Sequence, residues 1–312
     1  MKSVASLKLS IKGSAILLTV LLFVSGNSEA LSQRSTDDVN ISYGIKAWDP
    51  VKIKNEERTS SGQEFPVIRF TATNSTYYPF SLQIDFEQFT NLFPKPSVRP
   101  FTVMHGPNNL FSFSGHVPGK GYSYRYSYNY WIKPSEEVIN ENFPYLIPLA
   151  EGKRVTAKSN LIGRITDSFM GNKGDTVFCM RRGLVTAMPQ QESLEFRLSP
   201  HDCFEVLHDD GTYMVYHNLS KHDNMTAPGQ IVLPGQPIAT ISDSCYVSVT
   251  LLKVGEEKNL ITHRPISYAT GAESIVSFEE LDGKGLSARP YEVIILEMKG
   301  SEIKRAAKEK KK

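Results

Sequence analysis

Four cysteine and histidine side chains in the second half of the chain could bind a metal ion. They are Cys179, Cys203, His208 and His217. Thiolate sulfur and imidazole nitrogen are ligands that suit zinc. Cys203 and His208 are five residues apart, so in one strand their side chains would face opposite sides of the sheet. We therefore favour structural roles for these residues over a four-ligand zinc site.

Other catalytic signatures are missing from the sequence. It contains no GxSxG or HExxH motif, and 118-PGKGYS-123 lacks the first glycine and the following helix of a phosphate-binding loop. The third cysteine, Cys245, makes the count odd, so any disulfide leaves one thiol free. The sequence does not decide which cysteines pair.

The N-terminus has the pattern of an export signal over residues 1–30. Three lysines precede the apolar run 15-AILLTVLLFV-24, and Ser28-Glu29-Ala30 fits a signal-peptidase site. The run is shorter than the ~20 residues that span a bilayer. An uncleaved membrane anchor is the alternative. We expect a periplasmic or cell-surface protein that is not a lipoprotein and has no membrane span after cleavage.

The charge of the mature chain does not indicate nucleic-acid binding. Removing three lysines and one glutamate with residues 1–30 lowers the formal net charge from +2 to zero. The tail over 301–312 is basic, because 304-KRAAKEKKK-312 carries six positive residues and one negative. Such a tail can contact a polyanion, although a solvated end is the simpler interpretation.

Residues 31–135 are expected to form a β-sandwich. In 80-FSLQIDF-86 apolar and polar residues alternate, and 67-VIRFTATN-74 precedes it. These two segments are predicted to be neighbouring antiparallel strands. In 122-YSYRYSYNYW-131 the tyrosines share one face, which we expect to pack against a second sheet or a neighbouring domain; binding to a sugar is the alternative. They are Tyr122, Tyr124, Tyr126, Tyr128 and Tyr130.

The proline-containing segment 136–155 is interpreted as a linker to a second β-rich region. Predicted strands there include 203-CFEVLH-208, 212-TYMVYHNL-219, 245-CYVSVTLLKV-254 and 291-YEVIILEM-298. Residues 256–300 are predicted to be a β extension, and helical periodicity appears only in 298–312. The predicted fold class is all-β.

Three segments of the second region occur in an order and spacing that point to a family. They are 174-GDTVFCMRRGLVTAM-188, 205-EVLHDDGTYMVYHNLS-220 and 229-GQIVLPGQPIATIS-242. With these motifs, residues 156–255 resemble the lysostaphin-like zinc endopeptidases, also called LytM-type peptidoglycan hydrolases. The resemblance implies an antiparallel β-sheet groove of the duplicated hybrid motif type, holding one zinc on two histidines and an aspartate, with a further histidine for acid–base catalysis.

The positions that the resemblance assigns to this chemistry hold other residues. Arg164 and Ser168 stand where the first histidine and the aspartate belong, and Asn218 stands in place of the acid–base histidine. Tyr246 and Ser248 replace a His-x-His pair. Zinc hydrolysis needs three protein ligands and one open position, so we predict no catalytic residues and no metal.

The neighbouring His217 is displaced by one residue from the family's histidine. Because one residue reverses the face of a strand, we expect His217 to point away from the groove. The groove is expected to be lined by Arg164, Ser168, His208, Tyr216, Asn218, Tyr246 and Ser248.

The leading hypothesis is therefore an exported pseudoenzyme that acts as a binding, scaffold or regulatory component of the bacterial cell envelope. Its expected partner is peptidoglycan or an envelope protein complex, and no cofactor is expected. An active zinc endopeptidase with an unusual ligand set is the alternative, and a purely structural β-protein is a third. The sequence does not indicate the oligomeric state.

Overall fold

The structure is a computed structural model of the 312-residue chain, and it is nearly all β. It describes residues 4–11, 14–21, 50–59, 65–159, 166–189, 203–257, 260–281 and 285–309. The described residues from 50 to 133 belong to one compact unit and those from 134 onward to a second. The predominance of strands confirms the predicted all-β fold class.

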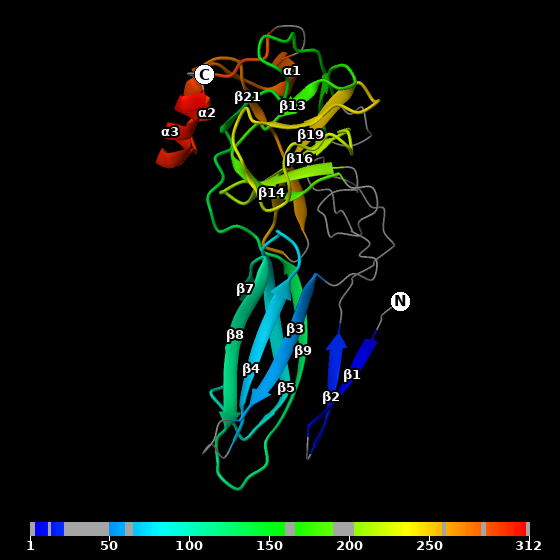
Figure 1. Ribbon diagram of the computed structural model, residues 1–312, viewed down its shortest axis with the longest axis vertical. Coiled ribbons are helices and arrows are strands. Elements are labelled where there is room, and N and C mark those ends of the chain that lie inside the picture. Colours follow the sequence, from blue (N-terminus) through cyan, green and yellow to red (C-terminus); the bar gives the residue numbers. More distant parts are fainter. Residues whose placement is uncertain are drawn as a thin grey trace. The chain divides into compact units, whose positions relative to one another are not determined.

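The first unit contains two antiparallel sheets of long strands (Figure 1). One has the order β3 (Val51–Arg58), β4 (Val67–Asn74), β8 (Gly106–Gly115), β6 (Leu92–Phe93). The other has the order β7 (Phe101–Val103), β5 (Phe80–Thr90), β9 (Ser123–Ile132).

The prediction that β4 and β5 pair with each other is wrong, because they belong to different sheets. β4 pairs with β3 and β8, and β5 pairs with β7 and β9. The connection between them turns at Asn74, whose side-chain amide donates to the carbonyl of Tyr78 at 2.8 Å. Alternating hydrophobicity identifies a strand but does not say which strand it pairs with.

The tyrosines of β9 contribute to the core of this sandwich. Tyr124, Tyr126 and Tyr128 are buried, and the ring centroid of Tyr126 lies 5.0 Å from that of Phe70 on β4. The expectation that the tyrosines pack against a second sheet is confirmed for Tyr126. Because these three rings are buried, they are not open to a sugar or another partner, which argues against the alternative of sugar binding for these three.

The second unit is built on an eight-stranded sheet. Its order is β11 (Ala157–Ser159), β12 (Asp167–Met170), β19 (Tyr246–Val254), β16 (Thr212–His217), β15 (Cys203–Leu207), β14 (Gly183–Ala187), β17 (Ile231–Val232), and β20 (Ile261–Arg264) pairs with β19. One smaller sheet pairs β13 (Thr176–Phe178) with β18 (Pro237–Thr240). Another has the order β10 (Pro144–Tyr145), β21 (Ser267–Ala269), β22 (Ile275–Val276).

The segment expected to be a linker is instead part of the second unit. Within 136–155, Tyr145, Leu146 and Leu149 are buried, and β10 pairs in parallel with β21. The main-chain N–H of Phe178 donates to the carbonyl of Pro148 at 3.0 Å. The two prolines that indicated a linker occur in a chain segment that contributes core residues.

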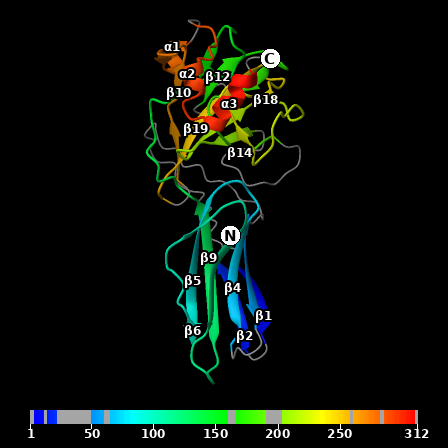
Figure 2. The ribbon, with the colours of Figure 1, turned by 60° about the vertical axis from the view of Figure 1, so that its left-hand side comes forward.

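The C-terminal part of the expected β extension is helical. Residues 291–298 form α2 (Tyr291–Ile294) and following turns, after the short helix α1 (Phe278–Leu281). Pro290 precedes α2, and its carbonyl accepts hydrogen bonds from Val293 and Ile294 at 3.1 Å. The last helix is α3 (Gly300–Glu309), which confirms the helical periodicity of the tail (Figure 2).

Two further strands, β1 (Val4–Ile11) and β2 (Ser14–Leu21), pair antiparallel near the N-terminus. They lie within the predicted export signal, whose cleavage stays a prediction. Among the described residues, none of the helices has the length and apolar character needed to cross a bilayer.

Candidate functional site

Four polar side chains lie side by side across the central strands of the large sheet. The register pairs Ser168 on β12 with Ser248 on β19, Ser248 with His217 on β16, and His217 with Cys203 on β15. Directly opposed residues of antiparallel strands project from the same face. We call these four residues the polar row.

Hydrogen bonds join the polar row into two pairs. The hydroxyl oxygens of Ser168 and Ser248 are 2.6 Å apart, and Cys203 Sγ is 3.0 Å from His217 Nδ1. All four side chains are buried, and both serines have an exposed fraction of 0%. The polar row is thus a buried set of hydroxyl, thiol and imidazole groups, whereas the sequence predicted an open groove.

The opposite face of these strands is apolar and forms the core of the second unit. Phe169, Phe204, Tyr216 and Val249 project from it. The hydroxyl of Tyr216 accepts a hydrogen bond from the main-chain N–H of Met180 at 2.9 Å. Burial holds the pKa of Tyr216 well above its ordinary value, so this phenol stays protonated.

The predicted orientations of Tyr216 and His217 are therefore exchanged. His217 shares its face with Ser168 and Ser248, and Tyr216 faces the core. The prediction that Tyr216 and His217 point to opposite faces is correct, but the groove was assigned to the face of Tyr216, which is the core face. Tyr216 is a core residue, and His217 belongs among the side chains that surround the expected site.

Asn218 and Tyr246 lie at the end of the sheet where the polar row is found, and both are partly exposed. Asn218 follows β16 with a φ of 64°, and its carbonyl accepts a hydrogen bond from the N–H of Ser242 at 2.9 Å. Tyr246 begins β19, two residues before Ser248, and so projects from the same face. Both predicted groove residues are therefore partly accessible, although the side-chain amide nitrogen of Asn218 is itself buried.

His208 lies at the other end of the β15–β16 hairpin. It is five residues from Cys203, which corresponds to roughly 17 Å along an extended strand. Its Nδ1 is 2.8 Å from the carbonyl of Arg182 and therefore carries the proton, and burial, reinforced by nearby Arg181, lowers the pKa of His208 to about 3. His208 is a neutral structural histidine and does not join the polar row. Arg164 lies outside the described residues.

The donor set of the polar row does not fit a catalytic zinc ion. The resemblance requires an aspartate and a histidine where Ser168 and Ser248 share a hydrogen bond, and neutral hydroxyls are not ligands of the usual zinc sites. Across the described residues, no three histidine, cysteine, aspartate or glutamate side chains are close enough to hold a metal.

The four cysteine and histidine residues considered at the outset form no common site. Cys203 and His217 meet, but Cys179 donates a hydrogen bond to the carbonyl of Arg181 at 2.9 Å and packs in the core. The three cysteines are free thiols; Cys179 and Cys203 are buried, and Cys245 is exposed.

Sequence reasoning missed a second buried polar cluster, the arginine pair Arg181 and Arg182. Arg181 donates to Asp210 at 2.8 Å and forms an ion pair with Glu297, and Arg182 forms one with Glu302. Exposed fractions are only 3% for Arg181 and 4% for Arg182. The available signal was the presence of two adjacent arginines directly before a predicted strand. Because arginine is rarely buried without a partner, such a pair indicates acidic partners elsewhere in the chain.

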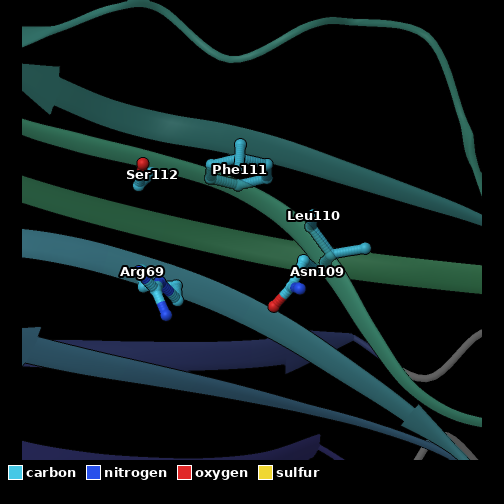
Figure 3. A pocket seen from close by; sticks show the side chains of 5 residues that line it. All are labelled: Arg69, Asn109, Leu110, Phe111 and Ser112. Atoms are coloured by element: carbon cyan, nitrogen blue, oxygen red, sulfur yellow. The ribbon is translucent and has the colours of Figure 1, made fainter.

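A shallow pocket of about 300 Å³ lies in the first unit on strands β4 and β8 (Figure 3). Leu110 is an extra residue in β8, because Phe111 pairs with Phe70 and Asn109 pairs with Thr71. Arg69 is the only charged residue of the lining. The pocket marks a β-bulge and offers no group of side chains for acid–base or nucleophilic chemistry.

The sequence matches no protein-family model and no curated protein. Two solved structures of Helicobacter pylori Csd3 are similar to this chain. The orthorhombic form has 9% identity and a TM-score of 0.28, and the match covers 79% of this chain and 56% of that chain. The hexagonal form has 12% identity and a TM-score of 0.29, with 80% and 55% covered. This chain thus spans little more than half of the Csd3 chain. TM-scores of this size are too low to indicate a shared fold or function.

Proposed function

We propose that the chain is an exported, catalytically inactive relative of the lysostaphin-like endopeptidases that binds a component of the bacterial cell envelope. One observation carries the proposal. Ser168 and Ser248 are 80 residues apart in the sequence, and the motif resemblance selects both as positions of zinc ligands. Their hydroxyl groups are 2.6 Å apart in the structure. The resemblance thus selects two residues that do meet in space.

The same two residues supply the argument against catalysis. An aspartate and a histidine can coordinate zinc and lower the pKa of a bound water, whereas two serine hydroxyls that bond to each other offer no charge to a metal. The nearby Cys203 and His217 are also bonded to each other. The alternative of an active zinc endopeptidase would therefore need ligands other than those at the family's positions.

Binding is assigned to the accessible end of the site, at Asn218 and Tyr246. The ring of Tyr246 offers an apolar face with a hydroxyl, and Asn218 is partly exposed at the same end of the sheet. A neutral mature chain gives no long-range preference for a charged polymer. The proposed partners are peptidoglycan and an envelope protein complex, in a scaffold or regulatory role.

Cosedimentation with purified peptidoglycan sacculi, and capture from detergent-extracted envelopes, test this proposal. The mature chain 31–312 should be retained by one of the two, and Asn218→Ala/Tyr246→Ala should reduce retention at least about fivefold, as expected for loss of roughly 1 kcal/mol of contacts. Asn109→Ala in the first unit and Tyr291→Ala on α2 are matched controls. Equal retention of all variants would refute the assignment of binding to this site.

A further inference from the structure

One end of the β-sandwich in the first unit carries apolar and basic side chains in a fixed arrangement. β5 and β8 end there, β9 begins there, and Leu92 pairs with Gly115. We call residues 91–95 and 116–121 the sandwich tip. In Figure 1 the β8–β9 loop extends beyond the ends of the strands.

Asn91 holds the two loops of the sandwich tip together. Its side-chain amide donates to the carbonyls of Lys120 at 2.8 Å and Val117 at 3.2 Å. Its side-chain oxygen accepts a hydrogen bond from the N–H of Val117 at 2.7 Å, and its own carbonyl accepts one from His116 at 3.1 Å. Asn91 has a φ of 51°, a conformation that asparagine tolerates better than most residues. The tip is therefore an organised structure.

This organised structure exposes apolar side chains. Phe93 has an exposed fraction of 59% and Val117 of 37%, whereas Phe80 and Phe113 of the same unit are buried. The ring of His116 lies 5.4 Å from that of Phe93 and supports its position. Fixing a large apolar ring in water gains nothing for folding, so the arrangement points to contact with another apolar phase.

The charges that flank the apolar residues are positive. Lys95 and Lys120 are exposed, and neither forms an ion pair among the described side chains. The nearby carboxyl of Glu57 accepts a hydrogen bond from Tyr122. Aromatic rings favour the interface between bilayer and water, and lysines are attracted to anionic headgroups.

We propose that the sandwich tip is a docking site for the surface of an anionic phospholipid bilayer. Phe93 and Val117 enter the headgroup region, and Lys95 and Lys120 bind lipid phosphates. A solvated acidic polymer would use the lysines but not the phenylalanine, so the exposed ring favours the bilayer. The exported chain would then be a peripheral membrane protein held by the first unit, independently of the site in the second unit.

Vesicle cosedimentation of the mature chain 31–312 tests the proposal. The chain should bind vesicles of equal parts phosphatidylglycerol and phosphatidylcholine and should not bind phosphatidylcholine alone. Lys95→Gln/Lys120→Gln should weaken binding roughly 25-fold, from about fivefold for each lysine, and Phe93→Ser should weaken it at least about tenfold. Val138→Ser, at a side chain that is 92% exposed, and Lys52→Gln/Lys158→Gln are matched controls and should bind like the wild type.

The basic tail is the competing source of affinity. Lys310→Gln/Lys311→Gln/Lys312→Gln should change binding by less than the tip variants. If the triple change in the tail abolishes binding while Phe93→Ser has no effect, the proposal is wrong. Phe93→Trp supplies a direct measurement: its emission, after subtraction of the wild-type spectrum, should shift to the blue with anionic vesicles. An unchanged emission would overturn the docking site even if the chain sediments with the vesicles.

Discussion

The polar row and the arginine pair are two buried polar clusters of the second unit, and they differ in charge and in how they were found. In the row, the neutral hydroxyl groups of Ser168 and Ser248 are paired, and both residues stand at positions that the resemblance assigns to zinc ligands. The arginine pair binds Glu297 and Glu302 of the C-terminal segment and was invisible to motif reasoning. The buried arginines thus connect the C-terminal segment to the sheet through charged contacts, whereas the hydrogen bond between Ser168 and Ser248 joins the central strands through uncharged groups.

The largest expected effect is at the arginine pair. Arg181→Ala leaves Asp210 and Glu297 without their buried counter-charge, so the free energy of unfolding should fall by about 3–5 kcal/mol. Urea unfolding at neutral pH measures it. Arg69→Ala, at an exposed side chain of the first unit, is the control. A loss below 1 kcal/mol would show that the buried ion pairs contribute little.

A carboxyl on the core face of the row's strands should make stability depend on pH. Burial raises the pKa of Asp167 to about 6, although the hydrogen bond from Tyr268 at 2.6 Å opposes the shift. A raised folded-state pKa stabilises the protein below the unfolded value, about 4, and this contribution is lost as the pH rises through about 6. Asp167→Asn should therefore stabilise the protein by about 1–3 kcal/mol at pH 8, with the gain disappearing toward pH 4.

Thermal unfolding of the wild type and of Asp167→Asn across this pH range measures the difference. Asp85→Asn, at an exposed carboxyl of β5, is the control variant. A gain for Asp167→Asn that is the same at pH 4 and pH 8 would exclude ionisation of Asp167 as its cause.

The serine pair of the polar row should show energetic coupling. Ser168→Ala leaves the buried hydroxyl of Ser248 without its partner and should lower the free energy of unfolding by about 1–2 kcal/mol. Ser168→Ala/Ser248→Ala should be less destabilising than the sum of the single changes, because no unpaired hydroxyl remains. Additive losses in urea unfolding would contradict a shared hydrogen bond.

The smallest effect is expected at the ion pair between Arg182 and Glu302. Glu302→Gln removes one of the two charge partners of Arg182, leaving Asp209, and should destabilise the docking of α3 by about 0.5–1 kcal/mol, because Glu302 is partly exposed. Amide hydrogen exchange of α3 detects this local change. The hydrogen bond from Arg182 lowers the pKa of Glu302, so the difference between variant and wild type should shrink at acidic pH. Lys304→Gln, on the same helix, is the control.

The hydrophobic pattern predicted the strands of this chain well, through alternation at β9 and through apolar runs at β16 and β19. It failed at 291–298, where the residues favour a strand but Pro290 begins a helical turn and only Val293 of α2 is buried. It also could not assign β4 and β5 to their sheets, since pairing depends on connections that cross between layers.

The candidate site was predictable in part. The order of the motifs selected Ser168 and Ser248, which are hydrogen-bonded partners. Their burial, and the contact between Cys203 and His217, depend on the register of four strands and could not be derived from the sequence. His208 was predicted to line the groove, but it is buried at the other end of the hairpin, beside the carbonyl of Arg182. A motif match gives the order of residues along a hairpin but not the end at which a site lies.

Zinc content of residues 31–312 tests most directly the central claim that the polar row is not a catalytic metal site. The purified chain 31–312 would be incubated with zinc, desalted and measured by native mass spectrometry, alongside Cys203→Ser/His217→Ala. We predict no retained zinc in either protein. About one zinc per wild-type chain, absent from the variant, would contradict the claim and restore a hydrolase to consideration.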